Sequence, residues 1–477
     1  MYLGEAHKLL GMTDSLVVYP LSYAKPLYSG LLSLSLWLGS NRIIFAQSLQ
    51  VLCAACWVPI LFFLTLRVSG RELLAWGAAS LCVFDPWIFL YSRHLFADPL
   101  ATLFWMASLY PILKEKLRWR DHFFSGLLFG LSCVTNYRMI IFSPTMVLFF
   151  FIAQQTKIER KMGEIFFWFV AASFPMVLCH LIYELFRSPS NMSYAQQLGF
   201  QFSRHSSSPL QFHSLHTYFT LIHFYEGYCG EGFIILGFFD LLWRELKKPV
   251  GKLLVCTYGI SILGLSFFYF QYARVWSPLL FWHPLLSIFG IQFLSRWIAE
   301  RSFFQEKFLF VVLTGLLMVT FLPRVLAIQK TSIPYREAVS WIQSKKASNV
   351  RLFTSLPSLI RQLVPLGWDV QPTGNPITNL KILAEEGVDY FLVDANQFVR
   401  GYHSIVSERA DAYFVIHQLC QPALLFSCQS PKTFWTIFAW EHNVNSSETE
   451  HFLKNINTED FPCLEVYDLQ SCVRKYP

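Results

Sequence analysis

The chain has 477 residues, of which 54% are hydrophobic and only 14% are charged, and its mean hydropathy is +0.39. A soluble globular protein carries about a quarter charged residues, so this composition indicates a protein that crosses a membrane several times. The net charge of +7 does not indicate nucleic-acid binding, because the basic residues cluster in short loops between apolar segments, where membrane insertion places them.

The predicted elements begin with an outward-facing segment, residues 1–42, and continue with ten segments long enough to cross roughly 30 Å of hydrocarbon. These segments are residues 43–66, 72–90, 97–113, 122–136, 138–156, 164–187, 229–245, 252–272, 276–297 and 306–325. Every second connection is basic, so these connections are expected in the cytoplasm. The other connections, including the long loop 188–228, are expected outside.

The remaining part of the chain, residues 326–477, is more polar. Residues 334–342 and 380–386 are typical of helices, and residues 350–354 and 388–393 are typical of strands. This alternation predicts a small α/β domain outside the membrane. Because the outside is oxidising, disulfides are expected there, with Cys420–Cys428 and Cys463–Cys472 as one of the open pairings.

The predicted fold class is therefore a polytopic α-helical membrane protein with about ten spans and a small C-terminal extracytoplasmic α/β domain. Its three predicted parts are an outer loop (1–42), a transmembrane domain (43–325) and a soluble domain (326–477).

The stretch Tyr91–Pro99 places an arginine and a carboxylate, Arg93 and Asp98, between two apolar segments. Charges near the membrane are costly and usually mark function. Cations suit a phosphate group, a carboxylate suits a general base or a divalent metal ligand, and apolar walls suit a lipid tail. The other outward-facing candidates are Glu5, Lys25, Arg138, Arg274 and His283.

Several of these residues have an ordinary structural explanation as well. Asp98 before Pro99 suits the start of a helix, and Arg93 can extend its charge to the membrane interface. Lys25 can be a solvated loop charge, and Asn136 beside Arg138 suits a turn by itself. From the sequence alone, the structural and the functional explanation are both open for each of these residues.

Three motifs together resemble the GT-C-type membrane glycosyltransferases, in particular bacterial relatives of protein O-mannosyltransferases and of lipid A aminoarabinose transferases. Tyr23–Tyr28 resembles the family's Lys-Pro motif, followed by a surface helix at Ser29–Leu38. Tyr91–Pro99 resembles its Arg…Asp-Pro motif. Ala273–Pro278, followed by His283 and Pro284, resembles its late Arg-containing segment.

The resemblance implies transfer of a sugar, with inversion, from a polyprenyl-phosphate donor to a lipid, glycan or protein acceptor on the outer face of a bacterial inner membrane. Lys25, Arg93 and Arg274 would contact the donor phosphate, supported by Arg138 and His283. Asp98 would position the acceptor, bind a divalent metal or act as the base. The family's acidic pair in its first loop would fall before Met1 and would follow a further span, and Glu5 is the substitute acid within this sequence.

Three alternatives remain: a lipid or sugar transporter or flippase, a truncated inactive homologue, and a non-catalytic scaffold. A transporter is expected to carry polar or broken spans near the membrane midplane. The ionisable groups of this sequence gather toward the predicted outer ends of the spans, which favours the transferase.

Overall fold

The computed structural model describes most of the apolar region and the framework of a small sheet. The described stretches are residues 25–39, 43–93, 97–114, 117–153, 158–186, 213–245, 249–266, 276–280, 282–330, 334–346, 348–354, 367–372, 387–394, 420–427 and 462–470, with a few single residues between them. The start of the chain, including Glu5, lies outside this part.

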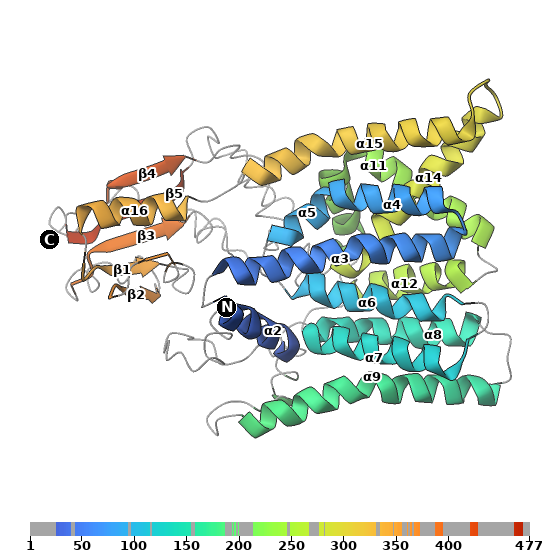
Figure 1. Cartoon of the computed structure of the whole chain (residues 1–477), viewed down its shortest axis with the longest axis horizontal. Helices are drawn as coiled ribbons and strands as arrows, with labels where there is room; N and C mark the ends of the chain where they lie inside the picture. The colour runs from blue at the N-terminus through green and yellow to red at the C-terminus, as the bar shows by residue number, and fades with distance from the viewer. Residues whose placement is uncertain are drawn as a thin grey trace.

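A bundle of antiparallel helices forms the larger part of the molecule (Figure 1). Its helices are α3 (Ile43–Ser69), α4 (Glu72–Phe84), α5 (Pro86–Arg93), α6 (Asp98–Ile112), α7 (Trp119–Thr135), η1 (Tyr137–Phe142), α8 (Ser143–Ala153), α9 (Ile158–Phe186), α11 (His213–Glu245), α12 (Pro249–Ser266), α13 (Ser277–Leu280), α14 (Trp282–Ala299) and α15 (Glu306–Lys330). The helix α2 (Pro26–Leu38) lies across one end of the bundle, at the position expected for a surface helix.

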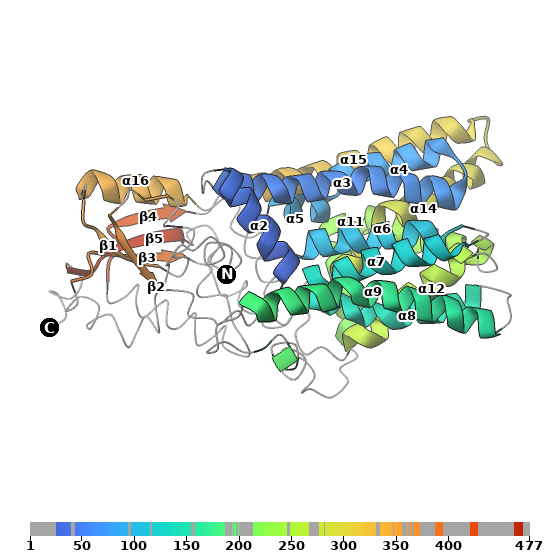
Figure 2. The same cartoon turned by 60° about the horizontal axis from the view of Figure 1, so that its bottom comes forward.

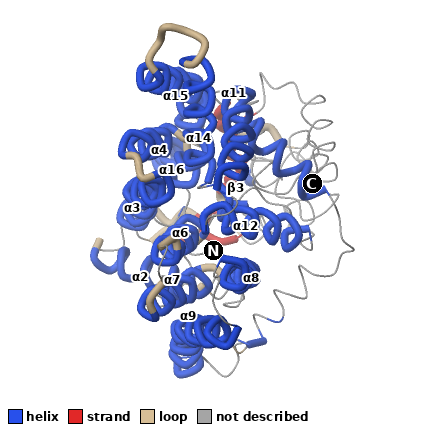
Figure 3. The backbone as a smooth tube through the Cα atoms, turned by 90° about the vertical axis from the view of Figure 1, so that its right-hand side faces the viewer, coloured by secondary structure: helices blue, strands red, loops and turns tan. Residues whose placement is uncertain are grey.

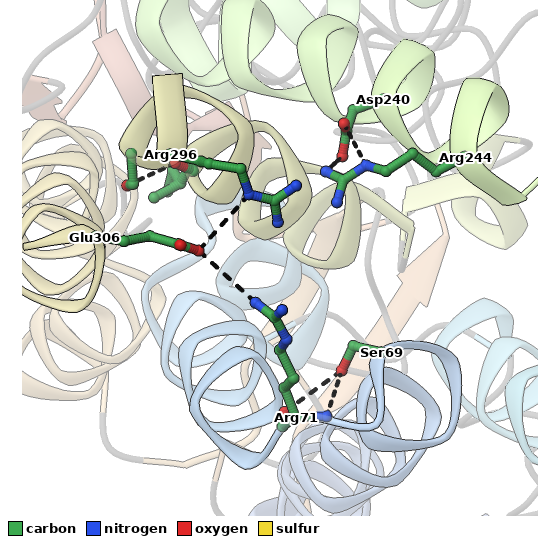
Figure 4. Close-up of polar contacts among 8 residues, drawn as sticks. Ser69, Arg71, Asp240, Arg244, Arg296 and Glu306 are labelled. Atoms are coloured by element: carbon green, nitrogen blue, oxygen red, sulfur yellow. Dashed lines mark hydrogen bonds and ion pairs between the residues drawn. The ribbon is translucent and has the colours of Figure 1, made fainter. Parts of the chain in front are cut away.

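The two ends of the bundle differ in charge. The connections that carry Arg71, Lys114 and Arg301 lie at the right in Figure 1, and we call this the basic end. The opposite end faces the small sheet, and we call it the sheet end. At the basic end, Arg71 Nη1 and Arg296 Nε lie 3.7 and 4.0 Å from Glu306 Oε1 (Figure 4). These groups are partly exposed, so the ion pairs orient α4, α14 and α15 more than they stabilise them.

The helices are apolar enough for a membrane protein, as the composition predicts. Among the described residues, four helices can each cross a membrane by length and hydropathy: Ile44–Ser69, Glu159–Leu185, Pro278–Ala299 and Glu306–Gln329. The pair α4 and α5, which bends by 56°, has the composition of a broken span or of a re-entrant loop. The helices α6, α7, α8, α11 and α12 occupy the other predicted segments. The chain is a polytopic membrane protein, while the number of ten spans stays a prediction.

Two segments of the bundle differ from the elements expected from sequence. The segment 72–90 is not one straight helix, because Asp85 and Pro86 separate α4 from α5. Residues 213–228 were expected in an outer loop, but they form the first part of α11. Gly227 breaks this helix with φ 69° and ψ 177°, a conformation that favours glycine.

Small residues let helix backbones touch inside the bundle. A Cβ atom at Gly126 of α7 would lie 2.3 Å from the Trp168 carbonyl oxygen of α9. A Cβ atom at Gly237 of α11 would lie 1.7 Å from the Leu286 carbonyl oxygen of α14. Such close contacts are typical of helix packing in membranes, where dispersion forces replace the hydrophobic effect between helices.

A five-stranded sheet lies beyond the sheet end of the bundle. Its strands are β1 (Arg351–Thr354), β2 (Asp369–Pro372), β3 (Tyr390–Asp394), β4 (Leu424–Ser427) and β5 (Pro462–Asp468), in the order β2-β1-β3-β5-β4. β1 is parallel to β2 and β3, and β5 is antiparallel to β3 and β4. The helix α16 (Tyr335–Lys345) covers one face (Figure 2) and buries Val339 and Ile342 against strand residues such as Leu392.

This arrangement confirms the helix expected near 334–342 and the strands expected near 350–354 and 388–393. The helix expected at 380–386 lies outside the described residues. Cys420 is disulfide-bonded, but its partner is not among the side chains that the structure describes, so the two proposed pairings stay predictions.

Candidate functional site

The first turn of α6 is fixed by side chains from two neighbouring helices. Trp57 Nε1 of α3 donates to the Pro99 carbonyl oxygen at 3.1 Å, and Ser132 Oγ of α7 donates to the Ala101 carbonyl oxygen at 2.6 Å. Pro99 suits this position because the first helical turn does not need its missing N–H group. The start of α6, and Asp98 with it, therefore has a defined place at the sheet end.

Asp98 is the first residue of α6, and its side chain is only 2% exposed. Asn136 Nδ2 donates a hydrogen bond of 2.8 Å to Asp98 Oδ1. Asn136 is oriented in turn, because its Oδ1 accepts from the backbone N–H of Arg138 at 3.3 Å. The other carboxylate oxygen, Asp98 Oδ2, has no hydrogen-bond partner among the described residues.

The two explanations considered for Asp98 can now be compared. The residue at the N-cap of α6 is Ala97, and no side chain caps this helix. The Asp98 carboxylate instead reaches a residue 38 positions away in sequence, on another helix. A buried carboxylate with one fixed oxygen and one unsatisfied oxygen is able to accept a proton or to bind a ligand hydroxyl or cation.

The start of α2 lies next to the segment that carries Asp98. Tyr28 packs with Ala97 and Leu100 in one apolar cluster. Its hydroxyl donates to Gln50 Oε1 of α3, and Gln50 Nε2 donates to the Tyr91 carbonyl oxygen, both at 3.1 Å. Two motifs that are far apart in sequence, Tyr23–Tyr28 and Tyr91–Pro99, are thereby joined through α3.

The predicted cation Lys25 precedes Pro26 at the start of α2, and its side chain is buried. This burial argues against a solvated loop charge. The end-on view in Figure 3 shows α2, α3, α6 and α7 grouped together, and these helices contact one another.

The structure places the other predicted site residues as follows. Arg138 lies in η1 directly after Asn136 and is half-buried. Arg93 ends α5, but its side chain lies outside the described part of the chain, as do Glu5 and Arg274. Three of the predicted residues, Lys25, Asp98 and Arg138, thus come from connected segments at the sheet end.

His283 belongs to a second, separate polar cluster. Its Nδ1 lies 3.3 Å from Glu226 Oε1 of α11, and its Nε2 lies 2.9 Å from the Tyr218 hydroxyl. Tyr218 continues to the Tyr258 hydroxyl of α12 at 3.2 Å. The Glu226 carboxyl also lies beside the carboxyl of Asp85, at the bend between α4 and α5. Both ring nitrogens of His283 therefore already have protein partners.

Sequence reasoning did not single out Glu226, Tyr218 or Tyr258. Glu226 was assigned to an outer loop because the span was expected to begin at residue 229. The available signal was an acidic residue within an aromatic and apolar stretch, which at helical periodicity faces a bundle interior. Asp85 lies at the bend between α4 and α5, and its Oδ1 accepts from the Ile88 backbone N–H at 2.9 Å.

A divalent metal was one of the roles considered for Asp98. Within the described residues, no group of three or more His, Cys, Asp or Glu side chains could hold a metal ion. The carboxylate and the Asn136 amide alone do not make a complete set of ligands for Mg²⁺ or Ca²⁺.

The role of Asn136 can be tested directly. Asn136→Ala leaves the buried Asp98 carboxylate without its partner, which is expected to lower the free energy of unfolding by about 1–3 kcal/mol. Thr135→Ala is the matched control, because the Thr135 hydroxyl donates only to the Leu131 carbonyl oxygen in its own helix. Thermal unfolding in detergent measures both, and equal losses would contradict the account of Asn136.

The chain is similar to known proteins in sequence and in structure. Residues 24–183 match the family described as Dolichyl-phosphate-mannose-protein mannosyltransferase. This segment holds Lys25, Arg93, Asp98, Asn136 and Arg138. No curated protein sequence matches the chain.

Among solved structures, the chain is similar to ArnT from Cupriavidus metallidurans bound to undecaprenyl phosphate. The TM-score is 0.56 at 11% identity, over 90% of this chain and 91% of that one. Apo ArnT gives a TM-score of 0.53 at 10% identity, over 99% and 93% of the two chains. The apo oligosaccharyltransferase of Archaeoglobus fulgidus gives 0.53 at 13% identity, over 83% of this chain and 65% of that chain.

These identities are too low to carry over a substrate, but the matches cover nearly the whole chain. Together with the sequence match over residues 24–183, they show that this protein has the fold of the GT-C-type membrane glycosyltransferases.

Proposed function

We propose that the protein transfers one sugar from a polyprenyl-phosphate donor to a hydroxyl group of a lipid, glycan or protein acceptor. The observation that carries this proposal is the Asp98 carboxylate, held by Asn136 at the sheet end beside the start of α2. The fold and the undecaprenyl phosphate named for one ArnT structure support a lipid-linked donor.

The proposed reaction uses the groups at the sheet end in two roles. A carboxylate, Asp98 or Glu5, takes the proton of the acceptor hydroxyl, whose oxygen attacks the anomeric carbon with inversion. The bond between that carbon and the phosphate oxygen breaks, and the lipid phosphate leaves with the bonding electrons. Lys25, Arg93, Arg138 and Arg274 stabilise the charge that develops on the phosphate.

The proposed topology follows from the basic end. Arg71, Lys114 and Arg301 would face the cytoplasm under the positive-inside rule. The sheet end and the soluble domain, residues 326–477, would then lie outside a bacterial inner membrane, with residues 1–42 and the ten spans of 43–325 as proposed from the sequence. A polyprenyl chain would lie along the apolar helix surfaces while its phosphate reaches the cations.

One observation favours a second candidate function. The bend between α4 and α5 and the break at Gly227 flank buried ionisable groups, as in transporters with discontinuous helices. Asp85 directly follows the 13 residues of α4, which at 1.5 Å per residue places it about 20 Å from the basic end. The cluster of Asp85, Glu226 and His283 therefore lies toward the sheet end. A transporter would move its substrate without changing it, whereas a transferase makes a new glycosidic bond.

Binding of undecaprenyl phosphate to the purified full chain in nanodiscs tests the proposed donor class. We expect binding that depends on the phosphate, so that undecaprenol without phosphate binds at least about tenfold more weakly, a difference of roughly 1.4 kcal/mol. Lys25→Ala is expected to weaken binding by a similar factor, through loss of a charge-assisted contact.

Lys307→Ala is the matched control, because Lys307 is an exposed lysine at the basic end. Equal affinity for undecaprenol and undecaprenyl phosphate would refute a phosphate site. Phosphate-dependent binding that Lys25→Ala does not change would place the site away from α2.

A further inference from the structure

The buried cluster of Asp85, Glu226 and His283 is not used by the proposed transfer reaction. It joins four parts of the bundle: the bend between α4 and α5, the break in α11, the start of α14 and, through Tyr218 and Tyr258, α12. The side chains of Asp85, Glu226 and His283 are all buried. Ionisable groups inside a membrane protein are costly, and such groups usually serve a function.

The hydrogen bonding of the two carboxyls limits their protonation. An ionised carboxylate only accepts hydrogen bonds, so two ionised carboxylates cannot bond to each other. The Asp85 and Glu226 carboxyls nevertheless lie next to each other in a buried site. Asp85 Oδ1 already accepts a hydrogen bond from the Ile88 backbone N–H, and this bond provides no proton for the contact with Glu226. One of the two carboxyls must therefore carry a proton.

The charges around the two carboxyls also indicate that the pair holds one proton. Arg324 of α15 lies against the Gly227 break, where a Cβ atom would be 2.4 Å from its Nη2, and it interacts electrostatically with Glu226. One carboxylate balances one guanidinium, whereas two carboxylates would leave an extra negative charge in a region of low dielectric constant. Tyr218 donates to Tyr258, so the Tyr218 oxygen accepts from Nε2–H of His283. Nδ1 of a neutral His283 then accepts a hydrogen bond from Glu226, which requires a proton on the Glu226 carboxyl.

We propose that Asp85 and Glu226 form a proton-binding site inside the bundle, which holds one proton between the two carboxyls. His283, Tyr218 and Tyr258 continue the hydrogen-bonded path from this site into α14 and α12. The site lies where two helices are interrupted, at Asp85–Pro86 and at Gly227, so the shared proton joins the two broken segments. This proposal does not depend on sugar transfer.

Infrared spectroscopy of the full chain in nanodiscs at neutral pH tests the proposal, because a protonated carboxyl has a carbonyl stretch well separated from that of a carboxylate. The double variant Asp85→Asn/Glu226→Gln keeps the shape of both side chains and is expected to lose the signal of one carboxylic acid. Asp98 is unchanged in this variant, so any contribution from it cancels in the difference spectrum.

Asp240→Asn is the matched control. Asp240 is a largely buried side chain in α11, and its two oxygens both pair with the Arg244 guanidinium (Figure 4). The control is expected to retain the full acid signal. A double variant that folds and also retains it, or a wild-type protein with no acid signal at all, would overturn the proposal. If the double variant does not fold, Asp85→Asn alone must weaken or shift the signal, and an unchanged signal would overturn the proposal as well.

Discussion

Asp98→Asn is expected to lower the rate of sugar transfer by about 10²- to 10⁴-fold, the usual contribution of a positioned acid or base. The substitution keeps the shape of the side chain and its place beside Asn136, but the amide cannot take a proton from the acceptor. Because Asp98 Oδ1 is fixed by Asn136, the loss should fall on the rate constant more than on donor binding. The measurement is product formation by membranes that carry each variant.

Asp121→Asn is the control for this experiment. Asp121 is also a buried carboxylate at the start of a bundle helix, α7, but it lies at the basic end, where it pairs with Lys114 and accepts from the Arg118 backbone N–H. This variant should keep its transfer activity. Full activity of Asp98→Asn would remove Asp98 from the reaction and leave the base outside the described residues.

Gly237→Ala is expected to lower the free energy of unfolding by about 3 kcal/mol or more, the upper part of the range for overpacked cores. The added Cβ would lie 1.7 Å from the Leu286 carbonyl oxygen, and this backbone atom cannot move without separating α11 from α14. Since α14 carries His283 and α11 carries Glu226, the same shift would disturb the buried cluster. Denaturation of the purified protein in detergent measures the loss.

The same substitution in the same helix should have the opposite effect at Gly232. A Cβ atom there meets nothing within 4 Å, so Gly232→Ala gains helix propensity of about 1 kcal/mol without a clash. Opposite signs for the two variants would confirm that close backbone contact, and not glycine itself, matters at residue 237. Equal effects would contradict the close packing of α11 on α14.

The parts of the fold that sequence could predict are those with a strong local pattern. The helix α16 is amphipathic, and the strands β1 and β3 are short apolar runs in a polar region; the structure has all three within a few residues of the expected bounds. The long apolar segments were equally evident. Their ends were less so, because α11 begins at His213, far before the apolar run that marks a membrane span.

Some residues of the candidate site could be proposed from sequence, because their motifs follow one another in a known order and lie on one predicted side of the membrane. Asp98 and Lys25 were proposed in this way, and both side chains are buried. The partners of Asp98 depend on helix packing, and only the fold shows that Asn136 serves both as a turn residue and as a hydrogen-bond donor to Asp98. Glu226 was missed because the span was expected to begin at residue 229, and its neighbours Asp85 and His283 come from helices that are distant in sequence.

The most direct measurement compares the lipid-linked sugars and the glycosylated products of a deletion strain that carries either the wild-type gene or Asp98→Asn. Sugar transfer at the sheet end predicts that a polyprenyl-phosphate-linked sugar accumulates in the Asp98→Asn strain while one glycosylated lipid, glycan or protein disappears. The wild-type gene should restore both pools. Identical profiles in the two strains, with both proteins present in the membrane, would contradict a transfer reaction that depends on Asp98.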